Sequence, residues 1–368
     1  MLISRNKWWF NLISHRRYME LAIELAKKGK GNTSPNPLVG SVIVKRGRIV
    51  GRGWHKKCGE AHAEICALKE AGKKAKDGII YVTLEPCSHW GRTPPCTEKI
   101  VEAGIREVVI GMEDPNPVVS GYQELKFRGI KTRIGILEEE CKKLNEPYSK
   151  WIKTKKPFVV VKAAMSLDGK IATRTGDSKY ITAKEAREFV HQLRAEYDAV
   201  MVGINTILKD NPQLTVRHAK GRNPIKIVVD TKLKIPLTSD VIKNEPTRLI
   251  VATSKKAPKA KIKKLKQKGV HVLVINLAKG RIDLKELMDE LGKKEICSIM
   301  IEGGAELNAE SIKAGIVDKI LVFISPKLIG EGLAALGDLG ITKIDKSIKL
   351  KNLNYKKIGR DILIEGYL

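Results

Sequence analysis

Apolar and polar residues alternate along the chain in the manner of an α/β protein. Short apolar runs typical of buried strands occur at residues 39–44, 79–84, 107–111, 158–164 and 199–203. Stretches with helical spacing fall among them: residues 18–28 and 61–71, a charged stretch at 138–151, and a stretch after Thr182 that ends at about residue 195. Because strands that alternate with helices form a sheet covered by helices, we expect a mixed α/β fold with helical layers on both faces.

The length of 368 residues suits two domains, each with its own core. Residues 153–157 (Lys-Thr-Lys-Lys-Pro) form a polar run with a proline, which is typical of a linker. A surface loop within one domain is the alternative. We therefore expect a first domain at 18–152 and a second at 153–368. Residues 1–17 are expected to be a disordered extension, with a targeting segment as the alternative.

Composition adds a strong positive charge to this picture. The formal net charge is +28, which could attract phosphorylated substrates or nucleic acid. The lysines spread along the chain, however, so a generally lysine-rich surface is the simpler interpretation. The basic run at 255–268 is interpreted as a solvated helix face. Aromatic residues make up only 5% of the chain, which argues against base-stacking surfaces.

The six cysteines show no disulfide framework spacing, which favours a reducing, cytoplasmic compartment. No apolar run approaches the length of a membrane span, so we expect no membrane association.

One stretch carries the strongest chemical signal. His62 and Glu64 lie in the predicted helix at 61–71, and Cys87 and Cys96 follow the predicted strand at 79–84. One histidine and two cysteines can hold Zn2+ and leave a fourth position for water, as in catalytic zinc sites. Zinc lowers the pKa of such a water towards 7, and Glu64 would transfer protons without binding the metal. This order of residues is typical of zinc deaminases.

Two alternatives apply to these residues. His62 and the cysteines could be an ordinary surface histidine and reduced thiols. His55 or Cys58 could supply a fourth ligand, but the chemistry requires that position to stay open. Eight residues separate Cys87 from Cys96, whereas deaminases acting on nucleosides or nucleic acids usually have two.

The motifs His62-Ala63-Glu64 and Glu85-Pro86-Cys87-Ser88-His89-Trp90-Gly91-Arg92-Thr93-Pro94-Pro95-Cys96 closely resemble those of the bifunctional riboflavin-biosynthesis deaminase–reductase family. Flanking segments at 35–40 and 113–117 resemble it as well. The resemblance implies a cytidine-deaminase-like three-layer α/β/α domain and places Asn36 against the pyrimidine ring. The segment 118–122 departs from the family pattern by being two residues shorter, so the shape of this substrate-side loop is open.

The second half resembles the reductase domain of the same family, which implies a dihydrofolate-reductase-like α/β fold. The resemblance is carried by residues 166–170, 205–217 and Glu302-Gly303-Gly304. A glycine pair between a strand and a helix also allows phosphate to approach backbone N–H groups, although this signal is weak alone.

The family pattern implies two sets of contacts in this half. NADPH contacts fall on Ala164, Tyr180, Thr206, Asp210, Thr231, Gly304, Ala305, Glu306, Leu307, Asn308, Ala309 and Glu310. Substrate contacts fall on Ser178, Arg194, Leu214, Arg217 and Glu302. The arginines suit a phosphate, because a guanidinium can bind it through two N–H groups. Lys162 and Asp168 would flank the ring or ribose.

The resemblance thus implies Zn2+ and NADPH as cofactors and two steps of riboflavin synthesis on a small phosphorylated pyrimidine. It also implies a homo-oligomer formed through the reductase domain, and no nucleic-acid partner. A nucleic-acid deaminase of the tRNA type and a non-enzymatic basic protein with a structural zinc are the alternatives.

Overall fold

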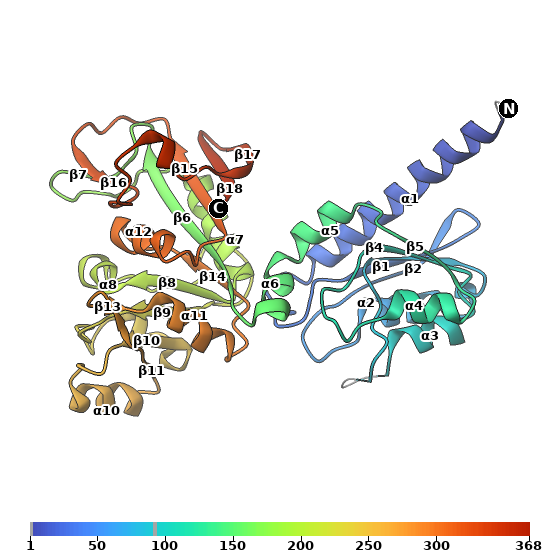
Figure 1. Cartoon of the computed structure of the whole chain (residues 1–368), viewed down its shortest axis with the longest axis horizontal. Helices are drawn as coiled ribbons and strands as arrows, with labels where there is room; N and C mark the ends of the chain where they lie inside the picture. The colour runs from blue at the N-terminus through green and yellow to red at the C-terminus, as the bar shows by residue number, and fades with distance from the viewer. Residues whose placement is uncertain (1–2, 91–93) are drawn as a thin grey trace. The chain divides into compact units, whose positions relative to one another are not determined.

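The computed structural model describes residues 3–90 and 94–368, with residues 3–13 as backbone only. The chain divides into two compact units, Met1–Thr154 and Lys155–Leu368 (Figure 1). The division falls inside the polar run that the sequence assigns to a linker. Each unit has its own sheet and its own buried clusters.

The first unit is built on a five-stranded sheet with the order β2-β1-β3-β4-β5. β1 pairs antiparallel with β2 and β3, whereas β3, β4 and β5 run parallel. The strands are β1 (Gly40–Lys45), β2 (Arg48–Trp54), β3 (Ile79–Leu84), β4 (Glu107–Met112) and β5 (Lys131–Ile134).

Helices cover both faces of this sheet (Figure 1). Ile80 and Val82 of β3 pack towards α2 (Ala63–Ala71), α3 (Cys96–Glu102) and α4 (Gly121–Phe127). Tyr81, between them, packs on the opposite face with α1 (Ile3–Lys27) and α5 (Glu138–Leu144). Successive side chains of a strand point to opposite faces, so an apolar strand supplies two cores. The expected three-layer α/β/α arrangement is confirmed.

Two helices of this unit differ from the sequence prediction. α1 begins at Ile3 instead of residue 18, because no glycine or proline interrupts residues 3–27, so the predicted disordered extension is helical from Ile3 onward. Met1 and Leu2 lie outside the described residues. The helix predicted at 138–151 is divided into α5 and α6 (Glu146–Thr154). At the division, the Asn145 side chain accepts from Leu38 N at 2.8 Å and donates to Leu38 O at 3.0 Å.

The second unit is built on a nine-stranded sheet with the order β11-β10-β9-β8-β14-β6-β15-β18-β17. Strands from β11 to β15 in this order run parallel, and β18 pairs antiparallel with both β15 and β17. The strands are β6 (Phe158–Ser166), β8 (Ala199–Gly203), β9 (Ile225–Val229), β10 (Leu249–Thr253), β11 (His271–Val274), β14 (Ser298–Ile301), β15 (Lys319–Ser325), β17 (Lys351–Ile358) and β18 (Asp361–Tyr367).

Two helical layers enclose this sheet as well. One buried cluster includes residues of α7 (Lys184–Glu196), α8 (Ile204–Asp210), α9 (Asp240–Lys243) and α10 (Lys259–Gln267). The other includes residues of α11 (Leu284–Gly292) and α12 (Ala305–Lys313). Two small sheets pair β7 (Lys170–Thr173) with β16 (Gly332–Ala334) and β12 (Leu277–Ala278) with β13 (Arg281–Ile282). Single 3-10 turns occupy Gly72–Ala75, Pro246–Arg248 and Ile344–Lys346.

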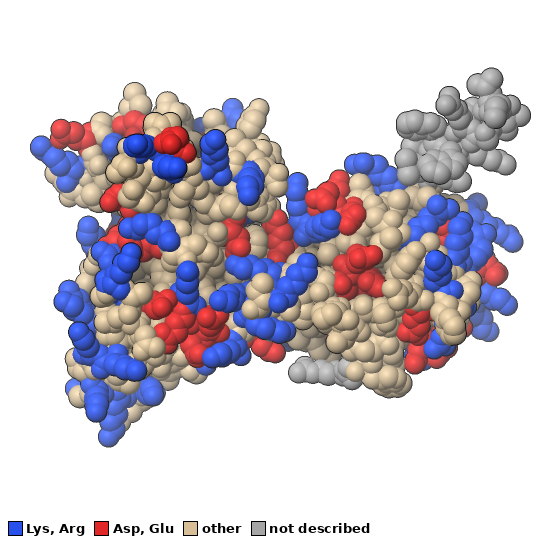
Figure 2. All heavy atoms as spheres, in the orientation of Figure 1, with Lys and Arg blue, Asp and Glu red and all other residues tan. Residues whose placement is uncertain are grey.

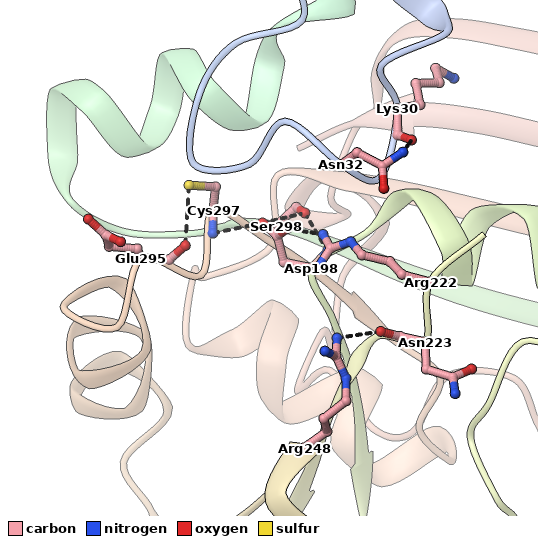
Figure 3. Close-up of polar contacts among 9 residues, drawn as sticks. All are labelled: Lys30, Asn32, Asp198, Arg222, Asn223, Arg248, Glu295, Cys297 and Ser298. Carbon is pink, nitrogen blue, oxygen red and sulfur yellow. Dashed lines mark hydrogen bonds and ion pairs between the residues drawn. The ribbon is translucent and has the colours of Figure 1, made fainter. Parts of the chain in front are cut away.

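A buried carboxylate holds the starting ends of β8 and β14 together (Figure 3). Asp198 Oδ2 accepts from Cys297 N at 3.0 Å and from Ser298 N and Oγ at 3.1 Å each. Arg222 donates to Asp198 Oδ1 at 2.5 Å. These contacts join segments that lie a hundred residues apart. They give this end of the sheet a structural role, opposite the edge at which the parallel strands finish.

Positive charge is distributed over both units, and acidic side chains are interspersed on the face shown in Figure 2. On α10 the lysines point mainly to solvent while Leu265 is buried, which agrees with a solvated helix face. Within the described part of the chain, no helix has the length and apolar character needed to cross a membrane.

Candidate active sites

Three donor atoms from separate segments meet beside the start of α2. His62 is the N-cap residue of α2, Cys87 follows β3, and Cys96 is the first residue of α3. His62 Nδ1 lies 3.3 Å from Cys96 Sγ and 3.5 Å from Cys87 Sγ, and all three donors lie within 4.8 Å of one another. Zinc bonds of about 2.0–2.3 Å in a tetrahedron place ligands roughly 3.5–3.8 Å apart. The geometry and the donor set therefore fit zinc.

The pKa values of these three donors also agree with a metal site. Hydrogen bonding with Cys96 lowers the pKa of Cys87 to about 4, and hydrogen bonding with Cys87 raises the pKa of Cys96. The hydrogen bond to Cys87 likewise raises the pKa of His62 to about 9. One thiolate is thus stabilised by protons on its two neighbours. A divalent cation at the same point would replace those protons, because metal ligands must be deprotonated.

Glu64 lies in the first turn of α2 and is almost fully buried, with 3% of its surface exposed. Burial raises the pKa of Glu64 to about 7, although the charge on His62 opposes this effect. A carboxyl group with a pKa near neutrality can both accept and release a proton under working conditions. Glu64 is therefore placed and tuned for proton transfer beside the three donors.

His55 takes a different role from the fourth ligand considered in the sequence. Its ring centroid lies 5.5 Å from that of His62, but both of its nitrogens have other contacts. Nδ1 donates to the carbonyl of Ala61 at 3.1 Å, so Nε2 accepts from the Asn36 Nδ2 at 3.1 Å. Among the described residues, the donor cluster contains only His62, Cys87 and Cys96. The contact between Asn36 and His55 was not predicted from the sequence. It connects Asn36, which the resemblance places against the substrate, to the segment before His62.

In the second unit, most of the predicted NADPH residues lie at one edge of the sheet, Tyr180 and Asp210 excepted. Ala164 lies near the end of β6, Thr206 in α8 directly after β8, and Thr231 shortly after β9. The segment 304–310 opens α12, which follows β14. These four strands are parallel neighbours, so their carboxyl ends lie at the same edge, where α/β sheets bind ligands.

The turn before α12 is suited to a phosphate. Gly304 is its N-cap residue, and a Cβ added there would meet no atom within 4 Å. Backbone N–H groups at the start of a helix attract anions. The side chains of Glu306 and Glu310 are engaged in ion pairs with Arg281 and Lys313, each at 2.6 Å. The segment therefore fits the pyrophosphate of NADPH through its backbone.

Arg194 and Glu302, both predicted to contact substrate, form a buried ion pair. Arg194 Nε donates to Glu302 Oε1 at 2.6 Å, and its Nη2 donates to Oε2 at 2.9 Å. The remaining terminal nitrogen, Nη1, donates to Thr215 O at 3.1 Å. Burial alone would raise the pKa of Glu302, but Arg194, followed by Lys162, holds it at about 2. The Arg194 guanidinium therefore forms a two-point ion pair with a carboxylate of its own chain.

Lys162 and His191 lie close to this ion pair. Burial lowers the pKa of Lys162, and the nearby Glu302 carboxylate partly offsets that effect. Burial, together with the charge of Arg194, lowers the pKa of His191 to about 4. Arg217 N donates to His191 Nδ1 at 3.2 Å, which requires a neutral ring with its proton on Nε2. The His191 ring therefore adds no positive charge at neutral pH.

Asp168 accepts hydrogen bonds that the sequence did not predict. Its carboxylate accepts from Ser166 Oγ at 2.5 Å and from Gly330 N at 2.7 Å, and it also accepts from Ile329 N. The Ser166 hydrogen bond, followed by that from Gly330, lowers the pKa of Asp168 to about 2. Asp168 thus holds the loop at 329–330 as a carboxylate, which does not suit a proton donor.

The remaining predicted residues differ in exposure. Tyr180 is 64% exposed, and the Arg187 guanidinium lies 4.3 Å from its ring centroid. An open cavity of about 540 Å³ borders Tyr180 and is lined also by Thr182, Ala183, Lys184, Glu185, Arg187, Gly359 and Arg360. Ser178 and Arg217 are exposed, whereas Leu214 is part of a buried cluster. Only the backbone of Leu214 is therefore available to a substrate.

Comparison with known proteins accounts for both units. A family model described as "RibD C-terminal domain" matches residues 157–364, and one described as "Cytidine and deoxycytidylate deaminase zinc-binding region" matches residues 12–112. The riboflavin biosynthesis protein RibD of Aquifex aeolicus is 47% identical over 352 residues, covering 95% of this chain and 97% of the relative.

Two solved structures extend this similarity to the fold. Form 1 of Acinetobacter baumannii RibD has a TM-score of 0.87 at 37% identity and covers 97% of this chain and 99% of its own. The deaminase/reductase of Thermotoga maritima has a TM-score of 0.86 at 38% identity, with the same shares covered. The expected deaminase-like and reductase folds are confirmed.

Proposed function

Because the chain belongs to the RibD family of riboflavin-biosynthesis enzymes, we propose that its two units catalyse consecutive steps on one phosphorylated pyrimidine. The first unit hydrolyses the 2-amino group of 2,5-diamino-6-(5-phosphoribosylamino)pyrimidin-4(3H)-one to give the corresponding uracil and ammonia. The second unit reduces the ribosyl group of that uracil to ribityl with NADPH. The observation that carries the proposal is the buried Glu64 beside three converging metal donors.

In the deaminase unit, His62, Cys87 and Cys96 would hold the zinc ion, which when bound supplies an activated water molecule. Glu64 accepts a proton from the attacking water at its carboxylate and delivers one to the departing amino nitrogen. The burial of this carboxyl group raises its pKa, which favours the protonated form between the two transfers. Asn36, held by His55, is proposed to contact the pyrimidine ring.

In the reductase unit, Thr206, Thr231 and the segment 304–310 would hold NADPH, which when bound would supply the hydride for reduction at C1′ of the ribosyl group. Lys162 is the proposed source of the accompanying proton, because burial lowers its pKa whereas Asp168 is held as a carboxylate. Arg217 is the proposed phosphate ligand, since its side chain is exposed. The guanidinium of Arg194 forms two hydrogen bonds to the Glu302 carboxylate, so we propose that Arg194 mainly positions that carboxylate.

The proposal extends to partners and location. We propose a homo-oligomer formed through the reductase unit, because edge strand β17 exposes Leu353 and Tyr355 by 63% and 75%. Light scattering across a dilution series tests this point. We propose a cytoplasmic enzyme without a nucleic-acid partner, since its six cysteines show no disulfide framework spacing and the spacing of Cys87 and Cys96 differs from that of nucleic-acid deaminases.

The decisive experiment supplies the zinc-loaded protein with the diaminopyrimidine substrate and NADPH, and follows ammonia release and NADPH oxidation separately. Ammonia release followed by NADPH oxidation is expected. The uracil product of the first step, supplied directly, should support NADPH oxidation without ammonia release. If neither product forms, the proposal is wrong, and release of ammonia from single-stranded nucleic acid would support the nucleic-acid alternative.

A further inference from the structure

The loop between β4 and α4 returns to the metal-binding segment at both of its ends. One carboxylate receives both ends: Glu85 Oε2 accepts from Asp114 N at 3.1 Å, and Glu85 Oε1 accepts from Tyr122 N at 2.8 Å. Glu85 is 8% exposed and lies two residues before Cys87. A single buried side chain thus closes the loop onto the segment that carries a metal ligand.

Two further contacts join the end of this loop to residues 86–88. Ser88 Oγ accepts from Ser120 N at 2.9 Å. A Cβ added to Gly121 would lie 1.9 Å from Pro86 O, so the backbones approach too closely for any other residue. The segment at residues 85–88 therefore contacts the loop through a carboxylate, a backbone carbonyl and a hydroxyl.

The loop also has an internal frame that begins at its first anchored residue. Asp114 Oδ1 accepts from Asn116 N at 2.9 Å and from the Tyr148 hydroxyl at 2.9 Å. Asp114, anchored by Glu85, thereby also holds Asn116, which lies next to the segment 118–122 that the resemblance places on the substrate side.

We propose that Glu85 is a positioning residue of the deaminase: by accepting both Asp114 N and Tyr122 N, it fixes the substrate-side loop against the metal-binding segment. This inference rests on the proposed deaminase function. It assigns Glu85 to the substrate wall, separately from the metal ligands and from Glu64. The loop should then affect substrate binding more than zinc retention.

The test is Glu85→Gln, which keeps the size of the side chain but turns an amide N–H against one of the two backbone donors. Loss of a hydrogen bond to a charged group changes a binding constant by roughly tenfold to hundredfold. We expect KM for the diaminopyrimidine to rise by about tenfold or more, with a smaller change in kcat. Zinc content and NADPH oxidation with the uracil substrate should match those of the unaltered protein.

Glu102→Gln is the matched control, because Glu102 is exposed on α3 and pairs only with Lys99 among the described ion pairs. It removes the same charge and should leave deamination unchanged. An unchanged KM in Glu85→Gln, or parallel loss of zinc and activity, overturns the proposal. If Glu85→Gln fails to fold, Ser88→Ala decides: a raised KM supports the anchored loop, and an unchanged KM overturns it.

Amide hydrogen exchange separates this proposal from the deaminase assignment itself. Exchange at residues 114–122 should speed up in Glu85→Gln while exchange in α2 stays the same, whatever substrate the enzyme accepts. Unaltered exchange in the loop overturns the positioning role. If the unaltered protein releases no ammonia although the loop responds as expected, the deaminase function fails and the structural role of Glu85 stands.

Discussion

Replacing Glu302 by glutamine should strongly destabilise the reductase unit, because it leaves the Arg194 guanidinium buried without its counter-charge. The two side chains are only 9% and 12% exposed, and two hydrogen bonds of 2.6 and 2.9 Å join them. Removing one partner of a buried ion pair costs about 3–5 kcal/mol. The pKa of Glu302 gives a similar figure, since lowering it from 4.5 to about 2 corresponds to about 3 kcal/mol.

The sign of the pH dependence follows from that lowered pKa. The stabilisation by Glu302 is fully present above pH 4.5 and is lost as the pH falls towards 2. The unaltered reductase unit should therefore lose stability across this range. Glu302→Gln should show a smaller loss there, because it carries no titrating group at this position.

Urea unfolding of the whole chain provides the assay with an internal control. All five tryptophans lie within residues 1–154, so tryptophan fluorescence reports on the first unit. Far-ultraviolet circular dichroism reports on both units. With about 2–3 kcal/mol lost per molar urea, the reductase transition should move down by about 1–2 M while the fluorescence transition stays in place.

A second variant separates the buried charge from a general packing effect. In Arg194→Met/Glu302→Gln the pair carries no charge and only Lys162 stays cationic beside it, so part of the lost stability should return. A reductase transition that does not move in Glu302→Gln would refute the reasoning. So would a double variant that is less stable than Glu302→Gln alone.

Three further predictions concern catalysis and pH. Glu64→Gln should abolish ammonia release while zinc content and NADPH oxidation with the uracil substrate remain; metal loss in that variant would count against its role in proton transfer. Arg217→Ala should raise KM of the reductase step for the phosphorylated substrate by about tenfold or more, as loss of a charge-assisted hydrogen bond implies, and an unchanged KM in steady-state assays would remove it from the phosphate site. His191, with its pKa lowered to about 4, should make the reductase unit lose about 1–2 kcal/mol as the pH falls from 6.5 towards 4, because only the unfolded chain binds the proton; His191→Gln should abolish that part of the loss in urea titrations.

The apolar runs predicted the central strands well, because each is buried on both faces. β3 and β8 begin and end at the predicted residues. β17 was missed for the opposite reason: it lies at the sheet edge, and nearly all of its residues are exposed, so it has no apolar pattern. The division between α5 and α6 was also missed, since it depends on Leu38, which lies 107 residues from Asn145.

The candidate sites were predictable to different degrees. The metal donors all lie within residues 62–96, and their residue types and order indicated the cluster that the structure brings together. The Glu302 partner of Arg194 and the 329–330 partners of Asp168 could not be predicted, because they lie 108 and more than 160 residues away. Two arginines in the sequence are equally suited to a phosphate. Only the fold shows that Arg194 is hydrogen-bonded to Glu302, whereas Arg217 is exposed.

The residues proposed for each step belong to one unit. Glu64 and the three metal donors belong to the first unit, with its own sheet and cores. The parallel strand ends, Lys162 and the Arg194–Glu302 pair belong to the second. A side chain tuned by burial depends on the packing around it, so the pKa of Glu64 depends on the first core and that of Lys162 on the second. Substitutions that alter one core should therefore change one activity and leave the other as an internal measure of correct folding.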